Sequence, residues 1–282
     1  MGVIKRLFLN FKTSFFLGWK IESNWTDPFL FTIYSLAKPL SSSFILIIMY
    51  LIITRGKIGL TFPHLLIGNA LHLYTANVLF GMAWAVVDDR EFYETLKYIY
   101  ISPVNLFIYL TGRGFAKFIT TSVSVGILIF VSFTFFKLSL NPIAGWFIIL
   151  PLFFILGVFS LFILGYLFAG LNFLIAKNGW FLTQSATGIF LLLTGAIFPL
   201  DVFPPFLRNI GYFIPQTIWM DGMRKILLGT GWNSFTKDMP ILSLTKLLLI
   251  QNVVYFIVVT LFFSTSLFIA RRKGLIDQKT LD

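Results

Sequence analysis

Residues 247–270 read LLLIQNVVYFIVVTLFFSTSLFIA, and the basic run Arg271, Arg272 and Lys273 follows at once. The quoted stretch contains no charged residue. About 20 consecutive apolar residues are enough for a helix to cross the hydrocarbon core of a bilayer. Residues 246–270 are therefore predicted to form a membrane-spanning helix that ends at a basic tail facing water.

Five further stretches upstream follow the same pattern. Residues 40–53 alone are too short to cross, so the first span is expected to begin after Asp27 and Pro28, a pair typical of a helix start. Residues 138–176 are predicted to hold one span, although Pro142 and Pro151 also allow two helices in a tight hairpin. The six predicted spans are residues 29–53, 64–87, 104–136, 143–176, 180–198 and 246–270.

The composition agrees with an all-α integral membrane protein. Hydrophobic residues make up 57% of the chain and charged residues only 12%, with a mean hydropathy of +0.88. A soluble domain carries about 25% charged residues. The absence of cysteine excludes disulfides and thiolate chemistry, and two histidines offer little to a transition metal. No cofactor or metal is expected to bind this chain.

The net charge of +11 is interpreted as contact with membrane lipid rather than with nucleic acid. The cations lie near the ends of apolar runs, where anionic lipid headgroups attract them. An even number of spans places both termini on the same side of the membrane. That side carries more Lys and Arg than the opposite one, so both termini are predicted to be cytoplasmic, in a plasma membrane.

Residues 1–27 are predicted to form an amphipathic helix that lies in the membrane interface rather than a signal peptide or a span. Apolar residues recur at helical spacing on one face, while lysine and arginine lie beside or opposite them. This helix is either an anchor that sets orientation or an elbow that transmits motion to the first span. The apolar face consists of Ile4, Leu7, Phe8, Phe11, Phe15 and Trp19.

Residues 88–102, DDREFYETLKYIYIS, concentrate acidic and aromatic residues between two spans on the predicted cytoplasmic side. Arg90 and Glu94 are four positions apart and Glu94 and Lys97 three apart, so one short helix would make them neighbours. This pattern predicts a docking surface for a partner, and a solvated loop is the alternative. The residues assigned to docking are Asp88, Asp89, Arg90, Glu91, Phe92, Glu94 and Lys97.

Residues 199–240 are predicted to form an external, re-entrant helical region. Prolines cut it into apolar pieces that are too short to span. Backbone without helical hydrogen bonds cannot face lipid, so such pieces lie against the bundle as a partly buried lid. The expected supports of this outer gate are Phe198, Pro199, Pro205 and Pro215.

Two polar stripes are candidates for a translocation path or an interface between two copies of the chain. Polar groups at membrane depth usually face the bundle interior. Hydrogen bonding between helices without any substrate is the alternative, and His72 is expected to be a packing residue rather than a metal ligand. One stripe is Asn69, His72 and Thr75 in the second span, and the other is Thr183, Gln184, Thr187 and Thr194 in the fifth.

Two sets of residues form a recognisable pattern. One is Thr95–Leu96, Ser102–Pro103 and Gly112–Arg113, and the other is Gly195–Leu200 (GAIFPL) with Pro205, Pro215, Arg224 and Gly229. On these residues the chain resembles the membrane subunits of ABC transporters of the type-2 permease class, which export polysaccharides, drugs and lipids. In that family a Gly usually precedes the Thr-Leu pair, whereas Glu94 stands there in this chain. The resemblance covers the order of amphipathic helix, spans, coupling segment and outer hairpin.

The resemblance implies an ATP-driven exporter in which two permease subunits, identical or different, assemble with two ATP-binding subunits. Those partners would bind ATP and Mg, and residues 88–102 would be the coupling helix. This chain has no phosphate-binding G-x-x-x-x-G-K-[ST] motif and no G-x-S-x-G, so it is expected not to be an enzyme. The alternative is an ion-coupled secondary transporter, which would need a charged midplane site and an inverted repeat.

Overall fold

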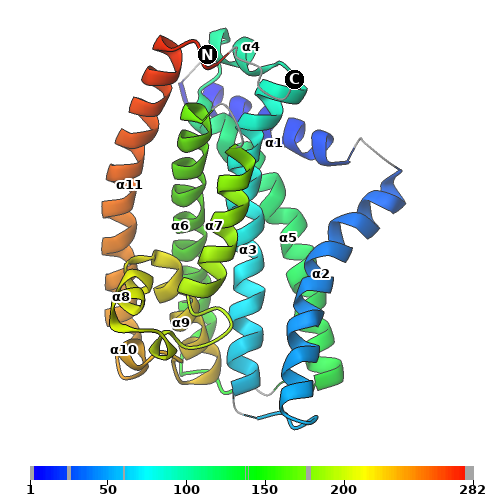
Figure 1. Cartoon of the computed structure of the whole chain (residues 1–282), viewed down its shortest axis with the longest axis vertical. Coiled ribbons are helices and arrows are strands. Elements are labelled where there is room, and N and C mark those ends of the chain that lie inside the picture. The colour runs from blue at the N-terminus through cyan, green and yellow to red at the C-terminus, as the bar shows by residue number, and fades with distance from the viewer. Residues whose placement is uncertain are drawn as a thin grey trace.

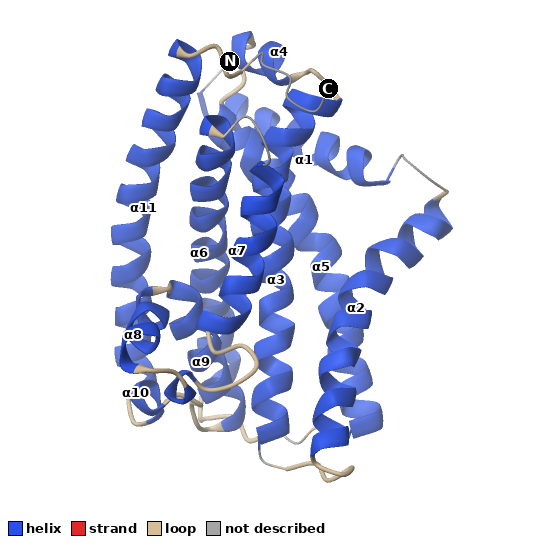
Figure 2. Ribbon diagram, in the orientation of Figure 1, coloured by secondary structure: helices blue, strands red, loops and turns tan. Residues whose placement is uncertain are grey.

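The computed structural model describes residues 3–23, 27–59, 61–136, 138, 140–175 and 179–276. In this part of the chain the structure consists of helices and loops, without strands (Figure 2). The longer helices are α1 (Val3–Ser23), α2 (Pro28–Ile53), α3 (Thr61–Val87), α5 (Leu106–Phe136), α6 (Trp146–Leu174), α7 (Gly179–Leu193) and α11 (Ile241–Arg272). The shorter elements are η1 (Asp88–Phe92), α4 (Leu96–Ile101), η2 (Leu200–Val202), α8 (Pro205–Phe213), α9 (Pro215–Leu228) and α10 (Ser234–Lys237).

Five helices of the described residues are long and apolar enough to cross a membrane, so the prediction of an all-α, multi-pass membrane protein is confirmed. The predicted count of six is not reached. α7 has 15 residues and ends at Leu193, whereas the predicted span ran to residue 198. At 1.5 Å per residue α7 is about 22 Å long, against roughly 30 Å for the bilayer core.

The alternatives for residues 138–176 are resolved by α6. It is one continuous helix, Trp146–Leu174, and Pro151 lies inside it. Gly145 precedes the helix with a φ of 74°, a left-handed conformation that glycine adopts without steric cost. A single span is therefore present where a hairpin was the other possibility. The predicted start of α2 is also correct, because Asp27 Oδ1 accepts a hydrogen bond from the Phe29 amide at 2.8 Å.

α3 is the central helix of the bundle, and α5, α6, α7 and α9 pack around it (Figure 1). Close approach relies on small residues. A Cβ atom at Gly114 of α5 or Gly165 of α6 would lie 2.6 or 2.4 Å from the Met82 side chain. Small residues let membrane helices come close enough for dispersion contacts to hold them together.

The two ends of the bundle carry different elements (Figure 1). α1, α4 and the C-terminal end of α11 lie at one end, and α8, α9 and α10 lie at the other. We refer to these as the α4 end and the hairpin end. The predicted coupling segment and the predicted re-entrant region are therefore at opposite ends of the molecule.

α1 packs along α5 near the α4 end. Phe11 and Phe15 contact Phe115 with ring centroids 5.7 and 6.0 Å apart. A Cβ atom at Gly112 would lie 2.6 Å from Cβ of Ser14, so the two helices cross closely there. The apolar face predicted for residues 1–27 is therefore divided, because its second half faces the bundle while Ile4, Leu7 and Phe8 remain exposed.

Candidate functional site

Residues 88–102 are not one short helix. η1 is a single turn of π-helix that continues α3 without a gap, and a new helix, α4, begins at Leu96. Between them Glu94 has a φ of 53°, in the left-handed region. The expected helical alignment of Arg90, Glu94 and Lys97 is therefore wrong. The left-handed backbone gives a physical reason for glycine at this position in the resembled family, because glycine has no Cβ to clash.

An ion-pair cluster fastens this segment to α5. Asp89 is 1% exposed, and its two carboxylate oxygens accept hydrogen bonds from Arg113 Nη1 at 3.2 Å and from the Tyr109 hydroxyl at 2.6 Å. Arg113 Nη2 lies 3.3 Å from Asp88 Oδ2. Burying a charge is tolerated when it is paired and hydrogen-bonded, as here. Asp88 and Asp89 thus hold the segment in place, and they contribute little to its exposed surface.

Arg90 fastens the same segment to α6. Its Nη1 and Nη2 donate to the carbonyl oxygens of Asn172 and Ile175 at 2.8 and 3.3 Å, and its Nε pairs with Glu91 Oε1 at 2.7 Å. A positive charge at a helix C-terminus satisfies free carbonyls and complements the helix dipole. The Asn172 amide in turn donates to the Thr183 hydroxyl of α7 at 3.3 Å. The segment is thereby linked to α5, α6 and α7.

The exposed side of the segment is mainly aromatic. Phe92, Tyr98 and Ile101 are 60%, 61% and 78% exposed, and Glu94 and Lys97 are exposed beside them. Of the seven residues assigned to docking, Phe92, Glu94 and Lys97 are therefore on the surface. Asp89, Arg90 and the Glu91 side chain lie inside. We call the exposed residues Phe92, Glu94, Lys97, Tyr98 and Ile101 the coupling face.

At the opposite end, α8 and α9 form a helical hairpin that turns at Ile214. The turn lies deep in the bundle, because Gln216 Nε2 donates to Ser160 Oγ of α6 at 3.1 Å. Ser160 is 14 positions from the start of α6, or roughly 20 Å along it. On the other side Gln251 of α11 donates to the Tyr212 carbonyl at 2.9 Å. The hairpin thus enters the bundle from the hairpin end and returns to that same end.

The end of α7 meets the turn of this hairpin. The Thr217 hydroxyl donates to the Gly211 carbonyl at 2.6 Å and lies 3.5 Å from the Leu193 carbonyl, the last in α7. Thr194, Gly195 and Ala196 continue from α7 as buried, non-helical chain. Such backbone is tolerated at membrane depth only when protein covers it. α7 and the hairpin together fill the depth that one full-length span would occupy.

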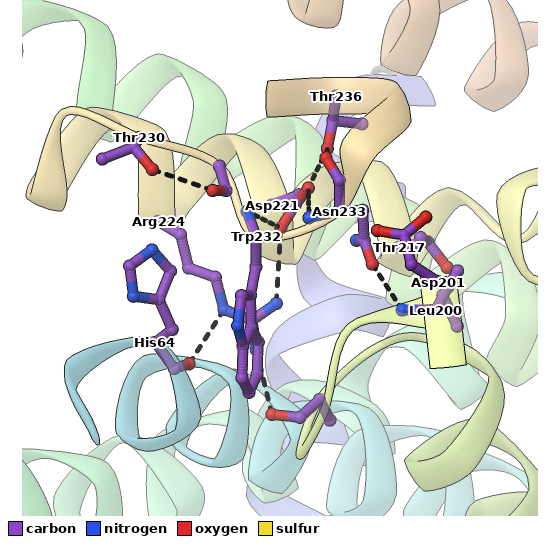
Figure 3. Close-up of polar contacts among 12 residues, drawn as sticks. His64, Leu200, Asp201, Thr217, Asp221, Arg224, Thr230, Trp232, Asn233 and Thr236 are labelled. Carbon is purple, nitrogen blue, oxygen red and sulfur yellow. Dashed lines mark hydrogen bonds and ion pairs between the residues drawn. The ribbon is translucent and has the colours of Figure 1, made fainter. Parts of the chain in front are cut away.

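A buried ion pair between Asp221 and Arg224 joins the hairpin to its surroundings (Figure 3). Arg224 is fully buried; its Nε donates to the His64 carbonyl and its Nη2 to the Ala196 carbonyl, both at 2.9 Å. The guanidinium also lies 4.5 Å from the centroid of the Trp232 ring. Burial lowers the pKa of Arg224 from its ordinary value, and the neighbouring Asp221 carboxylate opposes this shift.

Asp221 organises the loop after α9. Its carboxylate accepts the backbone N–H groups of Trp232 and Asn233 at 3.0 and 3.1 Å, and the Thr236 hydroxyl (Figure 3). The Asn233 side chain accepts the Leu200 amide at 2.7 Å. Sequence reasoning used Arg224 only as part of a motif and missed Asp221. An acid and a base three positions apart in a highly apolar chain are the signal that could have indicated this pair.

The predicted supports of the outer gate lie in and around the hairpin. Pro205 and Pro215 are the first residues of α8 and α9, where the fixed φ of proline suits a helix start. Pro199 precedes η2, and the Phe198 ring contacts the Phe203 ring at 5.4 Å. The four residues therefore set where the chain turns.

The two polar stripes do not form a common lining. Asn69, His72 and Thr75 are buried inside the bundle on the central helix, so a second copy of the chain cannot reach them in this conformation. Thr183 of α7 and Thr194, directly after α7, are buried and donate to carbonyls of α7. Gln184 is exposed and Thr187 is half-buried. The expectation of one continuous stripe along α7 is therefore wrong.

The fold and the site define a multi-pass helical membrane protein with a clamped surface segment at one end and a re-entrant hairpin at the other. The family described as ABC-2 family transporter protein matches residues 61–268, so the chain belongs to this family and is an ABC transporter permease. Permeases of this family generally work with separate ATP-binding subunits and are generally not catalytic themselves. A comparison with curated proteins finds no match.

Proposed function

We propose that this chain is the membrane subunit of an ATP-driven exporter in the plasma membrane. In this proposal two permease chains, identical or different, assemble with two ATP-binding subunits that carry ATP and Mg. The α4 end and both termini face the cytoplasm, and the hairpin end faces outward. The observation that carries the proposal is the coupling face, where exposed Phe92 and Tyr98 lie on a segment held from behind by buried ion pairs.

The buried ion pairs behind the coupling face give this surface a mechanical role. Removing one partner from a buried ion pair costs roughly 3–5 kcal/mol, so a segment held by such pairs moves together with its supports. Arg113 and Arg90 join the segment to α5 and α6. Motion of an ATP-binding subunit against Phe92 and Tyr98 would therefore move the ends of these spans. The hairpin, which carries Pro205 and Pro215, would close the path at the opposite end.

The test is to replace Phe92 and Tyr98 together by alanine and to measure copurification of the ATP-binding subunit with the tagged chain. Loss of these two anchors from the centre of a contact is expected to weaken association by at least about tenfold. The matched control is Phe206→Ala, which removes an exposed ring at the hairpin end. Unchanged association in the double variant, or an equal loss in the control, would reject the coupling face as the docking site.

A further inference from the structure

A polar pocket of about 230 Å³ lies between α1, α2, α3 and α5. Pro39 lies inside α2 and lines the pocket, and proline interrupts helical hydrogen bonding and bends a helix. Polar and charged side chains within a membrane protein cost free energy to bury, and those that are present are often functional. The polar lining of the pocket includes Glu22, Ser35, Asn77, Lys117, Thr120, Thr121 and Ser124.

The pocket lies at the level where α1 crosses α5. The closest approach of these helices is at Gly112, and Lys117 follows little more than one turn later along α5. Ser124 is seven positions beyond Lys117, or about 10 Å deeper. An amphipathic helix such as α1 lies at the boundary between headgroups and acyl chains. The charged part of the pocket is therefore at headgroup level and the hydroxyl groups lie below it.

Among the described residues that line the pocket, one acidic and one basic side chain balance each other. Glu22 Oε2 and Lys117 Nζ are 2.5 Å apart, and each side chain is about a quarter exposed, at 27% and 28%. Both charges can therefore meet a ligand that enters. One cation beside one anion complements a zwitterion, whereas it offers no net attraction to a singly charged group.

The hydrogen-bonding groups of the pocket further narrow the kind of ligand that fits it. The Thr120 and Thr121 hydroxyls donate to the Lys117 carbonyl at 3.0 and 2.7 Å, and both residues line the pocket. A hydroxyl that donates its proton in this way can still accept a hydrogen bond from a ligand. The Asn77 amide lines the pocket and makes no hydrogen bond within the part of the chain that the structure describes. Acceptors near Glu22 suit an ammonium group that has N–H donors. Lys117 and the Asn77 N–H groups suit a phosphate.

We propose that this pocket binds the headgroup of a phospholipid that carries a phosphate and a primary ammonium group. Lys117 contacts the phosphate, while Glu22 and the threonine hydroxyls accept hydrogen bonds from the ammonium. The lipid comes from the leaflet at the α4 end, since that is the level of the pocket. Glu22 and Ser35 precede the residues matched by the family, and the proposal does not depend on ATP-driven transport.

The experiment titrates the purified full-length chain with three lipids and counts bound lipid by native mass spectrometry. The lipids are phosphatidylethanolamine, phosphatidylcholine and phosphatidylglycerol. Phosphatidylethanolamine is expected to bind at least about fivefold more tightly than the other two, because only it supplies both a phosphate and N–H donors. Soluble glycerophosphoethanolamine is expected not to bind, and binding equal to that of the lipid would overturn the assignment to a membrane lipid.

Three variants make the test specific. Glu22→Gln leaves Lys117 without its anionic partner, so the preference is expected to change from phosphatidylethanolamine to phosphatidylglycerol, a reversal that misfolding would not produce. Ser35→Leu fills the pocket from α2 and should lower binding without touching the ion pair. Lys246→Gln removes an exposed cation on α11 and should change nothing. No lipid preference in the wild-type chain, or no reversal in Glu22→Gln, would overturn the proposal.

Discussion

At the scale of single residues, Glu94 combines an exposed side chain with a strained backbone. Its φ of 53° costs about 1–2 kcal/mol for a residue with a Cβ atom, and glycine avoids most of this cost. Glu91, three positions earlier, instead has its side chain buried against Arg90. Replacement by glycine is therefore expected to have opposite effects on stability at these two acidic residues.

Glu94→Gly is expected to raise the free energy of unfolding by about 1 kcal/mol, because the left-handed turn no longer strains the chain. Glu91→Gly is expected to lower it, because Arg90 loses a buried partner. The measurement is the apparent melting temperature of each purified variant in the same detergent. A lower melting temperature for Glu94→Gly than for the wild-type chain would contradict the strain argument.

Single residues also show where sequence reasoning stopped. The sequence indicates that residues 88–102 are unusual, because charges are scarce elsewhere. It does not indicate that Asp89 faces inward, since its partner Arg113 is 24 positions away and the pairing depends on how α5 packs against α3. Burial in a helix bundle is a property of the packed helices, and one charge pattern fits an exposed segment as well as a buried one.

At the scale of elements, the hairpin depends on Arg224, which binds three different parts of the chain. Its guanidinium reaches the His64 carbonyl, the Ala196 carbonyl and Asp221 together. A lysine has one ammonium on a flexible stem and cannot reproduce this planar arrangement. The hairpin should therefore be held less firmly when lysine replaces this arginine.

Arg224→Lys is expected to increase the reactivity of a cysteine placed at Ile214, the turn of the hairpin, because loosening lets water and reagent reach it. The chain has no native cysteine, so labelling reports this position alone. The measurement is the rate of maleimide modification of purified protein. Arg208→Lys in α8 is the control and should leave the rate unchanged. Equal rates in Arg224→Lys and wild-type chains would show that Arg224 does not restrain the hairpin.

Long helices were the more predictable elements, because an apolar run of sufficient length has few alternatives in a membrane. α2, α3, α5, α6 and α11 lie close to the predicted ranges. α7 was predicted too long, since residues 194–198 are as apolar as the helix before them. The chain leaves helical conformation there because Gly195, with a φ of 69°, turns it towards the hairpin. Hydropathy does not register such a turn.

At the scale of the whole molecule, the α4 end and the hairpin end are expected to face opposite sides of the membrane. Cysteine at Lys97 should be protected from a membrane-impermeant maleimide added to intact cells, and cysteine at Phe206 should react. Both side chains are exposed, so the difference reports the membrane and not burial. After cell lysis both should react, which serves as the control. Reaction of the Lys97 cysteine in intact cells would reverse the proposed orientation.

α3 and η1 form an unbroken helical segment from Thr61 to Phe92 that runs through the centre of the bundle. It carries no charged residue up to Val87 and ends in the charged turn of η1. One end carries the exposed Phe92 ring of the coupling face. Near the other end, Arg224 donates a hydrogen bond to the His64 carbonyl. Because η1 follows α3 without a break, a displacement of one end can be carried along the helix axis towards the other. Under the proposed function, a partner that pushes on Phe92 would shift the whole of this helix, so the coupling face and the hairpin end are expected to move together rather than in separate steps.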